Sequence, residues 1–205
     1  MNRPGALRTG LLLAVLAVLV GGCGDSEASS PGVDRRSTQS TPSTQAASSY
    51  TVPECPQLPR QEPVADGLPA LRLPCLGGGP AVRLSDLRGT PMVLNVWAAW
   101  CVNCDREMPL FSDAMARAGE KVRFFGVHYM AEEKYGERSA ADFGVQFPSV
   151  HDEDGDKVVK ALRTTAPPQT LFVTADGKVA GRKVGEITSQ EQLDDLIDRY
   201  LGVRL

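Results

Sequence analysis

The stretch PMVLNVWAAWCVNCDREMP, from Pro91 to Pro109, joins an apolar run to two cysteines separated by two residues. Residues 92–97 are dense in apolar and β-prone side chains, which predicts a buried strand. In the segment that follows, apolar residues recur at helical spacing until Gly119, which predicts a helix that ends at this glycine. The cysteine pair therefore lies at a strand-to-helix junction, with Cys101 at the start of the helix.

The chain after Gly119 continues this alternation of strands and helices. A strand is predicted over 122–130, a short helix over 139–145, a strand over 147–152, a helix over 156–163, a hairpin around Asp176-Gly177 and a last helix over 189–201. Alternating elements of this kind imply an α/β fold with a sheet covered on both faces. The order predicts a thioredoxin-like fold, in which a central mixed sheet is flanked by helices. A small β-hairpin is expected as an N-terminal extension within 50–85.

The N-terminal part of the chain has the features of an exported lipoprotein. Two arginines precede an uninterrupted apolar run over 11–20, and VGGC follows it and ends at Cys23. Residues 1–22 are therefore interpreted as a signal peptide and Cys23 as a lipidated residue, with a plain secreted protein as the alternative. A transmembrane anchor is disfavoured, because ten helical residues rise only about 15 Å. Residues 23–49, rich in Ser and Thr, are expected to be a disordered linker before a folded domain over 50–205.

The overall composition excludes some classes of function. The chain has 205 residues, a net charge of −3 and no basic block, so nucleic-acid binding is not expected. It contains only two histidines, His128 and His151, which makes a histidine-rich metal site improbable. Both histidines are interpreted as strand or strand-end residues, with a partly buried pair of His151 and Asp152 as one alternative, and neither histidine is assigned to catalysis.

With Cys23 set aside, the other four cysteines form two candidate pairs. Cys55 and Cys75 are interpreted as a structural disulfide, which would close a loop of about 20 residues and stabilise the fold by about 3 kcal/mol. Two free thiols, or a second redox pair, remain alternatives for these two residues. For Cys101 and Cys104, a zinc site lacks a second ligand pair, and a copper site is expected to have a longer gap and a well-placed histidine. A redox-active pair is therefore favoured and no bound metal is expected.

The motifs around the second pair resemble those of a known family. RLSDLRGTPMVLNVWAAWCVNCDREMP, GVHYMAEE, FPSVHDEDG and PQTLFVTADGKV are similar to segments of the membrane-tethered thioredoxin-like proteins of the TlpA/ResA/CcmG group. The resemblance covers residues 81–201. It implies a thiol:disulfide oxidoreductase outside the cytoplasm, lipid-anchored to the outer face of a bacterial cell membrane, without a small-molecule cofactor. Such proteins most often reduce exported proteins, often apocytochrome c, with electrons from a membrane thiol carrier. A monomer is expected.

The chemistry of the motif assigns roles to three residues. Cys101 is the expected nucleophile, because a helix N-terminus favours a thiolate, and Cys104 is expected to resolve the mixed disulfide. Thioredoxins carry a buried aspartate in the preceding strand, and the corresponding residue here is Asn95, which cannot titrate. The resemblance therefore makes Glu107, three residues after Cys104, the candidate proton acceptor. The alternative for Glu107 is an ordinary solvated helix charge.

The family resemblance also implies a substrate groove. Pro168 matches the family's cis-proline, Pro167 before it lacks an N–H, and Trp100 is expected at the rim of the pair. The chain departs from the family at Asn103, where proline is usual, and this leaves the redox potential open. A disulfide oxidant, a copper-delivery protein that uses the cysteine pair, and an adhesive or structural lipoprotein with a vestigial pair remain the alternatives.

Overall fold

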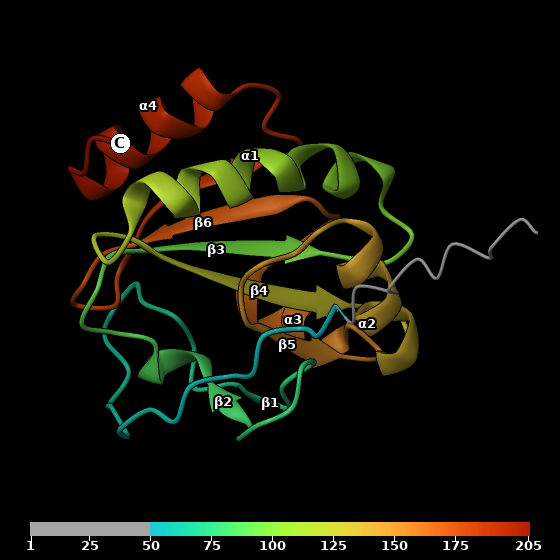
Figure 1. The fold of residues 1–205 in the computed structure, drawn as a ribbon. Coiled ribbons are helices and arrows are strands. Elements are labelled where there is room, and N and C mark those ends of the chain that lie inside the picture. Colours follow the sequence, from blue (N-terminus) through green and yellow to red (C-terminus); the bar gives the residue numbers. More distant parts are fainter. Residues whose placement is uncertain (1–49) are drawn as a thin grey trace, which may run out of the picture. The chain divides into compact units, whose positions relative to one another are not determined.

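The computed structural model describes residues 50–205, so the expected signal peptide over 1–22, the expected lipidation at Cys23 and the expected linker over 23–49 lie outside the described part. Four helices are present in this part: α1 (Val102–Ala118), α2 (Glu133–Asp142), α3 (Asp156–Leu162) and α4 (Gln190–Leu201). Figure 1 shows α1 and α4 together over one face of a sheet, while the segment over residues 50–86 lies away from these two helices, beside the strand β5 (Ser149–Asp152). Within 50–205, no helix is both long and apolar enough to span a bilayer.

The central sheet has five strands in the order β5-β4-β3-β6-β7. β3 runs parallel to β4 and β4 parallel to β5, whereas β6 is antiparallel to both β3 and β7. The expected mixed sheet of a thioredoxin-like fold is therefore confirmed. Every residue of β3 is buried, as its high content of apolar residues predicts for a strand covered on both faces. The strands are β3 (Met92–Trp97), β4 (Arg123–Tyr129), β5 (Ser149–Asp152), β6 (Gln169–Val173) and β7 (Val179–Val184).

The ends of the helices follow local capping chemistry. α1 begins directly after Cys101 and ends at Gly119, which has a φ of 55° and donates its N–H to Met115. α4 begins after Ser189, whose hydroxyl accepts a hydrogen bond of 3.1 Å from the N–H of Gln192. Capping residues that are recognisable in the sequence therefore fix the positions of both helices.

Helix α2 is the element that the sequence placed least well. It was expected over 139–145, but it begins at Glu133 and ends at Asp142. Its only buried residues are Gly136 and Ala140, so the helix carries almost no apolar pattern. Gly136 packs so closely on the His128 ring that an added Cβ would lie 2.7 Å from it. Close packing thus requires glycine at this position, although glycine has a low helix propensity and so makes the helix hard to predict from the sequence.

The N-terminal extension is attached to the edge of the sheet. Two short strands, β1 (Arg72–Leu73) and β2 (Val82–Arg83), form the expected small hairpin, and the 3₁₀ turn η1 (Leu84–Asp86) follows. A disulfide joins Cys55 to Cys75, and Cys75 forms an antiparallel bridge with Val150 of β5. The extension thereby covers an edge strand that would otherwise be open to pairing with another chain.

Candidate active site

The centre of the candidate site is a disulfide at the start of α1, between Cys101 and Cys104. Cys101 occupies the N-cap position, and its sulfur accepts a hydrogen bond of 3.1 Å from the N–H of Cys104. A sulfur in this position faces the unsatisfied N–H groups of the helix, which favour a thiolate after reduction. Cys101 is 5% exposed and Cys104 is fully buried, so Cys101 is the sulfur nearer to solvent.

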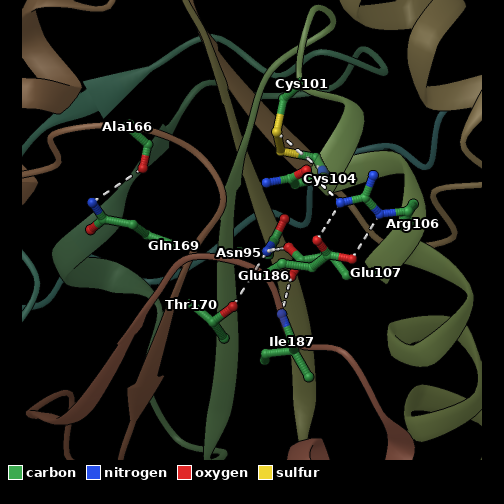
Figure 2. The surroundings of a disulfide bond; sticks show 11 residues. Asn95, Cys101, Cys104, Arg106, Glu107, Ala166, Gln169, Thr170, Glu186 and Ile187 are labelled. Atoms are coloured by element: carbon green, nitrogen blue, oxygen red, sulfur yellow. Dashed lines mark hydrogen bonds and ion pairs between the residues drawn. A yellow bond between two sulfur atoms is a disulfide. The ribbon is translucent and has the colours of Figure 1, made fainter.

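Glu107 lies one turn of α1 after Cys104 and is completely buried, so it is not a solvated helix charge. Its two carboxyl oxygens accept hydrogen bonds from different parts of the fold (Figure 2). The Asn95 side-chain amide donates to Oε1 at 2.8 Å, and the Ile187 backbone N–H donates to Oε2 at 2.9 Å. Burial raises the pKa of Glu107 to about 7, although both hydrogen bonds favour the charged form.

Asn95 has a structural part in this arrangement. It lies in the middle of β3, is 1% exposed and also approaches the Thr170 hydroxyl at 3.4 Å. The sequence identified Asn95 only as a residue that cannot titrate. The structure brings Asn95 together with Glu107. The residue at the position of the thioredoxin aspartate thus donates a hydrogen bond to the carboxyl that α1 provides. Ile187 was not anticipated, because it lies 80 positions after Glu107 and contributes only a backbone group.

A cis peptide bond joins Pro167 and Pro168 immediately before β6. Gln169, the next residue, is the register partner of Val96 near the end of β3 that leads to the cysteines. The Pro168 carbonyl accepts a hydrogen bond of 3.0 Å from the Gly185 N–H after β7. The two prolines thus lie at the same end of the sheet as the cysteine pair, as a groove beside the pair requires.

The two tryptophans near the pair have different environments. Trp97 is fully buried, and its ring lies 4.6 Å from the ring of His128. Trp100 is 54% exposed and donates its indole N–H to the Met130 carbonyl at 3.0 Å. Trp100 therefore presents an aromatic face to solvent one residue before Cys101.

The two histidines form a buried pair, which the sequence did not reveal. The Nδ1 atoms of His128 and His151 are 3.0 Å apart, on the neighbouring strands β4 and β5. Burial lowers the pKa of His128 to about 3. The expected pairing of His151 with Asp152 was wrong, because the Asp152 carboxylate instead accepts the Val158 N–H at the start of α3. Adjacent residues of a strand point to opposite faces, which accounts for this difference.

Comparisons with known proteins agree with this fold and with the position of the pair. The sequence model of the AhpC/TSA family matches residues 64–182. The thiol:disulfide interchange protein DsbE of Pseudomonas fluorescens biotype C is 32% identical over 133 residues, which are 64% of this chain and 72% of that protein. The thiol-disulfide oxidoreductase ResA of Oceanobacillus iheyensis is 35% identical over 120 residues, which are 58% of this chain and 59% of ResA.

Among solved structures, that of MTB DsbF in its mixed oxidized and reduced forms superposes with a TM-score of 0.57 at 28% identity. The superposition covers 65% of this chain and 98% of that protein. The matches to DsbE and ResA, the thioredoxin-like sheet and the cysteine pair at the start of α1 point to the same group of proteins. The chain belongs to the AhpC/TSA family and, within it, to the thiol:disulfide oxidoreductases.

Proposed function

We propose that this protein is a disulfide reductase that acts on exported proteins outside the cytoplasm. One observation carries the proposal: the carboxyl of Glu107 is fully buried on the same helix as Cys104, three residues after it, and this burial raises its pKa to about 7. An ordinary glutamate would be too weak a base to accept a thiol proton efficiently. A carboxyl with a pKa near 7 is closer to a thiol in proton affinity, so the transfer costs less free energy than it would with an ordinary glutamate.

The reaction requires two thiol-disulfide exchange steps. In the first, the Cys101 thiolate attacks a disulfide of the substrate, forms a mixed disulfide and releases one substrate thiolate. In the second, the Cys104 thiol gives its proton to Glu107, and the new thiolate attacks the Cys101 sulfur. The second substrate thiolate leaves, and the protein holds the Cys101–Cys104 disulfide. Two electrons pass from the protein to the substrate, and the proton on Glu107 passes to solvent or to the released thiolate.

The substrate and the cellular setting are inferred from the sequence and from the relatives. The names of the relatives describe thiol-disulfide interchange, which implies a cysteine-containing protein as the substrate. The family resemblance makes an apocytochrome c a candidate substrate and a membrane thiol carrier the electron donor. The apolar run over 11–20 and Cys23 support export and lipid attachment to the outer face of the membrane. Trp100, Pro167 and Pro168 would line the groove that receives the substrate chain.

Reduction of insulin by the dithiol form of the protein tests the proposed activity. We expect turnover with a thiol reductant, loss of turnover in Cys101→Ser, and a stable mixed disulfide in Cys104→Ser. Absence of both turnover and the trapped intermediate would contradict the assignment. The equilibrium potential against glutathione tests the direction of transfer, since a strongly oxidising value would make the protein a disulfide oxidant.

A further inference from the structure

The side chain of Arg106 joins two parts of the candidate site. Arg106 lies on α1 between Cys104 and Glu107, and its guanidinium binds Glu186 through two hydrogen bonds (Figure 2). Nε donates to Oε1 at 2.9 Å, and Nη2 donates to Oε2 at 2.6 Å. Paired contacts of this kind fix the orientation of both groups as well as their separation. Arg106 therefore ties the first turns of α1 to the loop between β7 and α4.

The same guanidinium also contacts the dipeptide between the cysteines. Nη2 of Arg106 donates a hydrogen bond of 2.6 Å to the Asn103 side-chain oxygen. Proline, the residue usual at this position in the family that the sequence resembles, has no side-chain acceptor. The contact thus depends on the residue in which this chain departs from the family pattern.

Glu186 is also connected to the proton acceptor. Ile187 follows Glu186 directly, and its N–H donates to Oε2 of Glu107 at 2.9 Å. The charged groups that act on Glu107 are Glu186, which raises its pKa, and Lys183 of β7, which lowers it. Arg106 compensates the charge of Glu186 while it fixes the residue that precedes the donor N–H.

We propose that Arg106 is a positioning residue, which aligns the Ile187 N–H with Glu107 by binding Glu186 and couples this alignment to the cysteine pair through Asn103. The proposal deepens the proposed function, since it rests on Glu107 as the acceptor of the Cys104 proton. Within 50–205 the hydrogen bonds of Arg106 go to Glu186 and Asn103 and not to either sulfur, so Arg106 is not a catalytic residue.

A purely structural role of the ion pair would give a different result. The Arg106 side chain is 55% exposed, and exposed ion pairs contribute little to stability. Its loss should therefore affect folding little. The loss of Arg106 should change the pKa of Glu107 more clearly than it changes the stability of the fold. The reason is that an uncompensated Glu186 carboxylate and a displaced Ile187 N–H both disfavour the ionised form of Glu107.

The chain offers a closely matched control for this experiment. Arg117, also on α1, binds Asp194 of α4 through two hydrogen bonds of 2.8 Å each. It contacts neither Glu107 nor the loop that holds Ile187 among its hydrogen-bond partners in 50–205. Arg117 also donates a hydrogen bond of 2.7 Å to Asp113 on α1, much as Arg106 does to Asn103. Arg117→Met therefore removes a pair between α1 and a carboxylate, together with one contact within α1, at positions outside the site.

The test is a carbon-13 NMR titration of the Glu107 carboxyl in the oxidised protein, assigned by its loss in Glu107→Gln. We expect Arg106→Met to raise the titration midpoint by about half a pH unit, Arg106→Lys to raise it less, and Arg117→Met to leave it unchanged. At pH 7 the resolution rate should fall about twofold in Arg106→Met, since fewer carboxyls are ionised. An unchanged midpoint in Arg106→Met, or an equal rise in Arg117→Met, would overturn the proposal.

The titration also separates this proposal from the proposed function. It follows the carboxyl directly and needs no substrate, so it reports on Arg106 even if the protein reduces no disulfide. If the midpoint shifts as expected while insulin reduction fails in the wild type, the positioning by Arg106 stands and the reductase assignment falls. If the wild type reduces insulin and the midpoint does not shift, only the proposal about Arg106 is contradicted.

Discussion

Replacing Glu107 by glutamine should remove a pH dependence that the buried carboxyl imposes on the stability of the oxidised protein. Burial raises the pKa of Glu107 from 4.5 to about 7. The folded protein keeps this proton over a pH range in which the unfolded chain has released it, so the free energy of unfolding falls as the pH rises through that range. One unit of pKa difference is worth about 1.4 kcal/mol, so the fall between pH 4.5 and pH 7 is about 3 kcal/mol.

The assay is urea denaturation of the oxidised wild type and of Glu107→Gln between pH 4.5 and 8.5. The disulfide cysteines do not titrate in this state, and the contribution of His128 is present in both proteins and cancels in the difference. The variant should gain relative to the wild type by about 3 kcal/mol across the window. Glu191→Gln, at an exposed position on α4, controls for the loss of one negative charge. A wild-type-minus-variant difference that stays constant from pH 4.5 to 8.5 would refute the raised pKa of Glu107.

Three further predictions concern kinetics, acid stability and the second disulfide. Glu107→Gln should slow resolution by Cys104 about 100-fold, while the first attack by Cys101 keeps its wild-type rate, as measured by rapid quenching. A resolution rate equal to that of the wild type would contradict a proton acceptor at this position. Burial lowers the pKa of His128 from 6.5 to about 3, so the contribution of His128 to stability should be lost as the pH drops below 6.5. In urea titrations the free energy of unfolding of the wild type should therefore fall relative to that of His128→Asn over this range, against the opposite effect of Glu107 that both proteins share. Replacing Cys55 and Cys75 together by serine should lower the free energy of unfolding by about 3 kcal/mol and leave insulin reduction intact; a loss of activity in the still folded variant would point to a second redox pair.

Local patterns in the sequence were sufficient to predict the strand β3 and the helix α1. The apolar run over 92–97 and the helical spacing that ends at Gly119 are properties of neighbouring residues, and the structure has both elements where they were expected. Helix α2 was misplaced because its pattern depends on Gly136 packing against His128, a contact between distant segments. A hydrophobic pattern identifies a helix through the apolar face that the helix buries, and α2 buries only a small face, so its sequence pattern is weak.

The candidate site also has some features that the sequence shows and others that depend on contacts between distant segments. The spacing of Cys101, Cys104 and Glu107 is visible in the sequence, because all three belong to one turn-by-turn pattern on a helix. The burial of Glu107 is not visible, since it depends on β3 and on a loop 80 residues away. The pairing of His128 with His151 likewise requires the register of β4 and β5. Strand registers and loop contacts are set by the packing of the whole domain, and a short stretch of sequence does not contain this information.

The position of the carboxyl on α1 separates two properties that a proton acceptor needs. Its spacing from Cys104 is set by the helix itself and cannot change without breaking backbone hydrogen bonds of α1. Its proton affinity is set by groups from other elements: burial raises the pKa, whereas Asn95 from β3 and Ile187 from the loop before α4 lower it. A small movement of that loop therefore alters the basicity of Glu107 while its spacing from the thiol along the helix stays constant. Arg106 acts on this adjustable part, because it fixes the loop to the same helix that carries both the thiol and the carboxyl.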